Sequence, residues 1–113
     1  MEKIKSYTDL EQSKMLAEIL PLESADMYYS NHSLENYYSP IPNIGNYSAM
    51  HNQIPCWSAS ALLEIIRNKG RHELQMYEGG YYFATNRFIT ESYFNPIDAC
   101  VEMIIQLYEL ELL

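Results

Sequence analysis

The sequence predicts a small α+β protein in which three helices pack against one antiparallel sheet of two to three strands. Two observations support this. Three segments repeat apolar residues at helical spacing behind a capping residue, and Gly79-Gly80 separates two strand-like runs. Because the 113 residues match the length of one ordinary domain, we treat 1–113 as a single domain.

The first helix is predicted over about residues 9 to 20. Thr8-Asp9-Leu10-Glu11 has the pattern of a capping box, in which the hydroxyl of Thr8 and the carboxylate of Glu11 satisfy backbone donors. The helix should end before Pro21, because the residue preceding a proline disfavours helical geometry.

The segment at about 21–55 is rich in Tyr, Asn, Ser and Pro. A loop of this length is uncommon in a compact domain, so it is either a functional surface loop or a stretch with short helical turns, for example at Asp26–Tyr29. Its tyrosines offer large contact area at low entropic cost. They either contact a partner or pack back over the sheet, and the candidate contacts are Tyr28, Tyr29, Tyr37, Tyr38 and Tyr47.

The second helix should begin at Ser58, whose hydroxyl can cap it, and should stop at Gly70. A hairpin follows, since the glycines at 79 and 80 can adopt the positive φ of a tight turn, which pairs Glu78 with Tyr81. In that register one face carries Leu74, Met76, Phe83 and Thr85. Residues 88–94 can add a third strand, and the open sheet edge would then be covered by the central segment or by a second copy of the chain in a homodimer.

The last helix should start at Asn95-Pro96, which combines a capping side chain with proline at the first helical position. Its apolar residues form a broad arc, which makes it the main helix of the core. The arc consists of Ile97, Cys100, Val101, Ile104, Ile105, Leu107 and Tyr108.

The net charge of -8 and a pI near 4.7 argue against direct binding to nucleic acid or to an anionic membrane. Two widely spaced cysteines favour reduced thiols. The N-terminal residues lack the apolar run of a signal peptide, and no stretch has transmembrane length. These observations predict a cytoplasmic protein.

Cys56 is the one candidate nucleophile, because a thiol at a helix N-terminus has its pKa lowered by the helix dipole. Cys56-Trp57 is similar to the start of the catalytic helix in papain-like enzymes, although the preceding Gly-Ser and the distant downstream histidine and asparagine are absent. His51 or His72 would have to act as the base. The alternative is a small buried side chain beside a core tryptophan.

Metal and cofactor sites are not predicted. The three histidines, with Asp26 and Glu35, supply suitable ligand types, but their spacing matches no compact metal motif. They are His32, His51 and His72. Phosphate-binding and dinucleotide-binding loops are also absent from the sequence, so we expect no cofactor.

Three segments together resemble short uncharacterised proteins from gut-bacterial prophages and other mobile elements. They are Tyr7–Ser13, the run from Ile54 through Trp57-Ser58 to Leu63, and Asn95–Ile104. In such proteins these segments lead an N-terminal helix, a Leu-rich helix and the last helix. The resemblance implies no activity or site residue, and it favours a small accessory protein over a metabolic enzyme.

The sequence therefore predicts a non-enzymatic accessory protein that binds a protein partner through an acidic, tyrosine-rich surface. One alternative is an acidic mimic of nucleic acid that inhibits a DNA-handling enzyme. A second alternative is a cysteine-dependent enzyme that uses Cys56.

Overall fold

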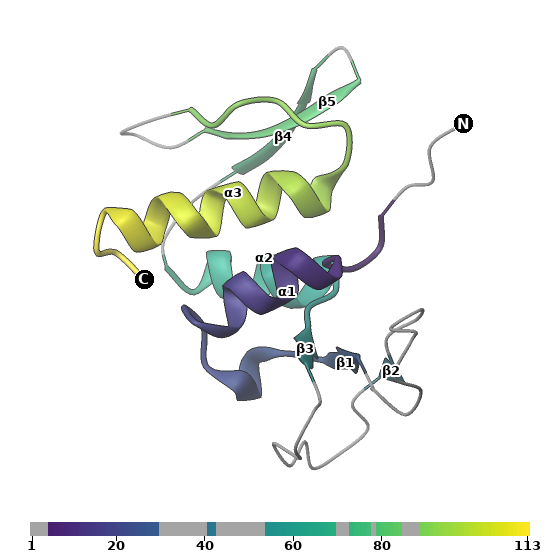
Figure 1. Ribbon diagram of the computed structural model, residues 1–113. Helices are drawn as coiled ribbons and strands as arrows, with labels where there is room; N and C mark the ends of the chain where they lie inside the picture. The colour runs from purple at the N-terminus through teal and green to yellow at the C-terminus, as the bar shows by residue number, and fades with distance from the viewer. Residues whose placement is uncertain (1–4, 30–40, 43–53, 70–72, 78, 85–88) are drawn as a thin grey trace.

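The computed structural model describes residues 5–29, 41–42, 54–69, 73–77, 79–84 and 89–113. Its α-helices are α1 (Leu10–Ala17), α2 (Ala59–Arg67) and α3 (Pro96–Glu109), and a short 3-10 helix η1 spans Leu22–Ser24 (Figure 1). The strands are β1 (Met27–Tyr29), β2 (Ile41–Pro42), β3 (Ile54–Cys56), β4 (Glu73–Tyr77) and β5 (Gly80–Ala84). The predicted α+β class is confirmed.

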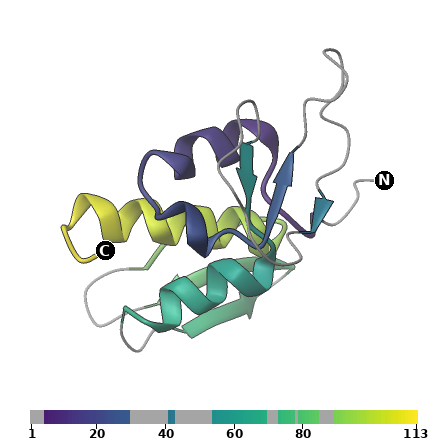
Figure 2. The same cartoon turned by 90° about the horizontal axis from the view of Figure 1, so that it is seen from below.

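Helix α3 lies in the middle of the molecule. The β4–β5 hairpin covers one side of it and α1 and α2 lie on the other, with β1 and β3 beyond them (Figure 1). Seen from below, α1 and α2 lie on either side of the line of α3 (Figure 2). The buried residues of α3 are Ile97, Ala99, Cys100, Val101, Met103, Ile104 and Leu107, which confirms it as the main helix of the core.

The helix caps agree with the sequence in two cases and differ in one. Ser58 caps α2 and Asn95 caps α3 as predicted, each accepting a hydrogen bond from a backbone N–H. Helix α1, however, is capped by Asp9, which forms a capping box with Gln12, and it ends at Ala17. The predicted cap at Thr8 is wrong because that hydroxyl is buried and is used in other contacts.

The hairpin exists, but its register differs from the prediction. Tyr77 pairs with Gly80, and Tyr81 pairs with Met76 rather than with Glu78. Gly79 has a φ of 81°, so it supplies the positive φ that the turn needs, and Gly80 belongs to the strand. A shift of two residues keeps every side chain on its predicted face, because strand side chains alternate with a period of two.

In the described part of the predicted third strand, residues 89–94, pairing with β5 consists of two isolated bridges, Tyr81 to Tyr93 and Ala84 to Ile89. Backbone hydrogen bonds join Tyr81 and Tyr93 in both directions, at 2.7 and 2.9 Å. Residue 88, where the strand was expected to start, lies outside the described residues.

A second antiparallel sheet, with strand order β2-β1-β3, was not predicted. It contains Met27–Tyr29, where the sequence had suggested a helical turn, and Tyr28 pairs with Ile41 on one side and Pro55 on the other. The helical interpretation is therefore wrong. The strands are two or three residues long and far apart in sequence, so they show no periodicity that would reveal them.

Among the helices of the described residues, none combines the length and the apolar character that crossing a membrane requires.

Candidate functional site

A groove of about 490 Å³ opens where the N-terminal ends of α1 and α3 approach each other. Both helices begin toward the right of Figure 1. Its lining residues are Lys5, Asp9, Glu11, Gln12, Met15, Tyr93, Asp98, Val101 and Glu102. Four carboxylates thus face one ammonium group, and we call this site the acidic groove.

The positions of three of the four carboxylates follow from helix capping and the helix dipole. Asp9 is the N-cap of α1, while Glu11 and Asp98 lie in the first turns of α1 and α3. Acidic side chains at these positions satisfy orphan N–H groups and interact favourably with the positive end of the helix dipole. Bringing two helix N-termini together therefore concentrates negative charge in one groove.

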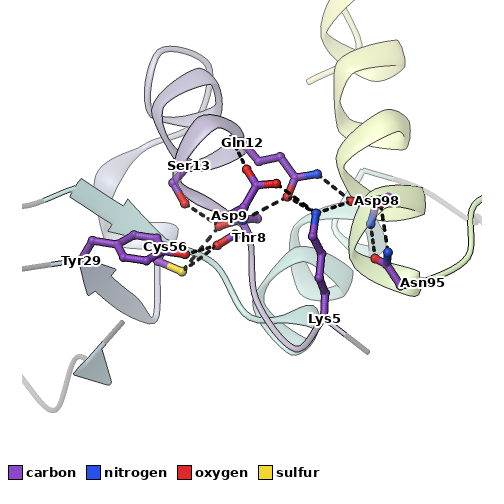
Figure 3. A network of polar contacts seen from close by, with 9 residues as sticks. All are labelled: Lys5, Thr8, Asp9, Gln12, Ser13, Tyr29, Cys56, Asn95 and Asp98. Atoms are coloured by element: carbon purple, nitrogen blue, oxygen red, sulfur yellow. Dashed lines mark hydrogen bonds and ion pairs between the residues drawn. The ribbon is translucent and has the colours of Figure 1, made fainter. Parts of the chain in front are cut away.

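The side chain of Lys5 contacts both the N-cap of α1 and the first turn of α3, which line the groove (Figure 3). Its Nζ lies 3.0 Å from Oδ2 of Asp9 and 2.9 Å from Oδ1 of Asp98. Gln12 Nε2 donates to the same oxygen of Asp98 at 2.8 Å, and Asn95 Nδ2 donates to Oδ2 of Asp98 at 2.9 Å. Asp98 is thus held by three side chains from three parts of the chain.

The electrostatics of the groove follow from these contacts. Burial alone would raise the pKa of Asp98, but hydrogen bonds from Lys5, Gln12 and Asn95 outweigh it and hold the pKa below its usual value. Burial alone would lower the pKa of Lys5, and the two carboxylates reverse this and raise it. Both groups are therefore charged at neutral pH.

Tyr93 lines the same groove. Burial is the main cause that raises the pKa of its hydroxyl, and the charges of Glu102, Glu91 and Asp98 raise it further. Glu11 has no hydrogen bond or ion pair with another described residue. Glu102 accepts hydrogen bonds from neutral donors, namely the amide of Gln106 and the hydroxyl of Tyr93. The single ammonium of Lys5 thus balances only one of the two carboxylates that it contacts, and Glu11 and Glu102 have no cationic partner among the described residues.

A buried polar cluster lies behind the groove and is centred on Thr8 (Figure 3). Its hydroxyl is 2.7 Å from that of Ser13 and accepts the backbone N–H of Trp57 at 3.2 Å. The hydroxyl of Tyr29 donates to the carbonyl oxygen of Thr8 at 2.7 Å. The cluster joins α1 to the three-stranded sheet and is closed to solvent.

Cys56 belongs to this cluster and is fully buried. Its Sγ lies 3.5 Å from both oxygen atoms of Thr8. Burial raises the pKa of the thiol, and the hydrogen bonds of its neighbours only partly oppose this. The expected lowering of this pKa by a helix dipole is wrong, because Cys56 lies in β3 ahead of the α2 cap. The arrangement disfavours a thiolate nucleophile.

The other predicted site residues fall into two groups. Tyr29 exposes only 4% of its surface and Tyr28 is half-buried, so both pack at least partly within the fold. The residues that lie outside the described part of the chain are His32, Glu35, Tyr37, Tyr38, Tyr47, His51 and His72. Within the described part, no group of three or more His, Cys, Asp or Glu side chains is placed to hold a metal ion.

Sequence reasoning did not find the acidic groove. The signal was present in the capping acids near residues 9 and 98, but local patterns do not show that two helix N-termini are neighbours. No family model, no curated protein and no solved structure matches this chain. The resemblance to mobile-element proteins therefore stays a prediction.

Proposed function

We propose that this chain is a cytoplasmic, non-enzymatic accessory protein that binds a protein partner through the acidic groove. One observation carries the proposal: the groove holds four carboxylates and one ammonium group, and Glu11 and Glu102 are left without a cationic partner among the described residues. A basic side chain from a partner would supply the missing counter-charge.

The groove also offers apolar and aromatic contact area. Tyr93 lines it, and Met15 is 38% exposed at its edge. Arginine fits this mixture, because its planar guanidinium binds carboxylates in a bidentate manner and stacks on aromatic rings. The partner surface is therefore expected to present an arginine with apolar neighbours.

The cysteine-enzyme alternative receives less support, since Cys56 is buried and burial raises its pKa. The nucleic-acid-mimic alternative also depends on the negative charge of the protein, but it predicts that the partner is a DNA-handling enzyme. Competition by DNA separates these two, because a mimic occupies the same basic surface as the nucleic acid.

The experiment is affinity capture from a gut-bacterial lysate, a source suggested by the sequence resemblance. The bait is the full chain, and the test variant is Glu11→Gln/Glu102→Gln. The control is Glu18→Gln/Glu109→Gln, which changes the net charge equally at two exposed positions outside the groove. Retained proteins are identified after washes at low and at high salt.

The proposal predicts a protein that is retained by the wild type and by the control and lost by the groove variant. Equal retention by all three baits would reject the groove as the interface. If the retained protein is a nucleic-acid enzyme that added DNA releases, the mimic alternative replaces the leading one.

A further inference from the structure

A second groove, of about 440 Å³, is lined by residues at or just beyond the C-terminal ends of the three helices. These helix ends lie toward the left of Figure 1. Its lining residues are Ile19, Leu20, Pro21, Ser24, Ile65, Asn68, Lys69, Tyr108 and Leu113. We call it the apolar groove. Among the described residues, no carboxylate side chain lines it, and Lys69 is the one charged side chain in its lining.

The walls of this groove are mainly hydrophobic side chains that the core leaves accessible. Ile19 and Ile65 are only partly buried against the core, and Tyr108 is 53% exposed. Ser24, also in the lining, accepts a hydrogen bond from the indole of Trp57 at 3.0 Å. The single tryptophan of the chain therefore contacts a lining residue, and its fluorescence is expected to change when the groove is occupied.

Lys69 supplies positive charge at the groove. It is exposed, and it forms no ion pair with any other described residue. Carbonyl groups at the nearby helix ends accept backbone hydrogen bonds, including Leu16 from Leu20 and Ile66 from Lys69. The ammonium group is thus available to an anion, in contrast to the ammonium of Lys5 in the acidic groove.

We infer that the apolar groove binds a free fatty acid, whose alkyl chain lies against the hydrophobic walls while its carboxylate pairs with Lys69. A monomeric fatty acid is favoured over a lipid in a bilayer, because a net charge of -8 opposes approach to an anionic membrane surface. This inference does not depend on the acidic groove or on its partner.

The test titrates octanoate, decanoate and dodecanoate, each below its micelle concentration, into the full chain. Trp57 fluorescence and calorimetry follow binding. Saturable one-to-one binding is expected, with affinity rising by up to about fourfold for each added methylene that is buried. Far-UV circular dichroism at each point checks that the helices persist, because a detergent-like action would unfold them.

Two charge-matched variants locate the head group. Lys69→Glu removes the ion pair and adds repulsion, so it should weaken dodecanoate binding by about tenfold. Lys14→Glu changes the net charge equally on α1, outside the groove lining, and should change affinity by less than about twofold. Absence of saturable binding, loss of helical signal during the titration, or an equal effect of the two variants would each overturn the inference.

Discussion

The ammonium of Lys5 lies 2.9 Å from the carboxylate of Asp98, which is 93 residues further along the chain. This contact joins the segment that precedes α1 to the first turn of α3. It therefore links the two helix N-termini that line the acidic groove.

Asp98→Asn should destabilise the fold by about 1–2 kcal/mol, because it weakens the charge-assisted hydrogen bonds that converge on this partly buried side chain. Urea unfolding monitored by circular dichroism measures the change. Glu109→Gln, at the exposed far end of α3, is the control and should shift stability by less than about 0.5 kcal/mol. Equal stability of both variants would show that the Lys5–Asp98 contact contributes nothing.

The stability should also depend on pH through Asp98. Its pKa in the folded state lies below the usual 3.8, so between these values the unfolded chain binds more protons. This contribution is complete above 3.8 and is lost as pH falls through the folded-state pKa. The Asp98→Asn variant should therefore lose less stability than the wild type on acidification, as measured by unfolding at a series of pH values. Parallel curves for the two proteins would contradict this assignment.

The stability of the fold should also depend on pH in the alkaline range, through Lys5. Because its pKa is raised above 10.5 in the folded state, its contribution is complete below 10.5 and is lost as pH rises through the folded-state pKa. Lys5→Met, which removes the ammonium and keeps much of the chain length, should show a weaker alkaline loss of stability than the wild type.

Cys56 should react slowly with a thiol reagent in the native protein and rapidly in denaturant. Burial raises the pKa of this thiol, and burial raises that of Cys100 to about 12. Timed labelling with mass spectrometry measures both rates in one sample. Fast native labelling of Cys56 would revive the cysteine-enzyme alternative.

Tyr29→Phe should destabilise the protein by about 1–3 kcal/mol, because it removes the hydroxyl that donates to the buried carbonyl of Thr8. Partner capture should survive, since Tyr29 is almost inaccessible. Tyr108→Phe, at a side chain that is 53% exposed, is the control for stability. A variant with normal stability and lost capture would instead assign Tyr29 to the interface.

Two helix caps and the hairpin could be predicted from the sequence, because they depend on interactions between residues close together in the chain. Ser58 and Asn95 cap helices because their side chains accept nearby backbone N–H groups, and the glycines mark the hairpin. Thr8 was misassigned, because its local pattern competes with long-range contacts to Ser13 and Trp57. The β2-β1-β3 sheet and the acidic groove arise from pairing between distant segments, which local patterns do not encode.

The most direct test of the central claim compares the dissociation constants of the captured partner for the two charge-matched double variants. The account predicts binding weakened by about tenfold for Glu11→Gln/Glu102→Gln, since two ion pairs at the rim are lost, and binding near that of the wild type for Glu18→Gln/Glu109→Gln. Equal dissociation constants for the two variants would contradict the acidic groove as the partner site.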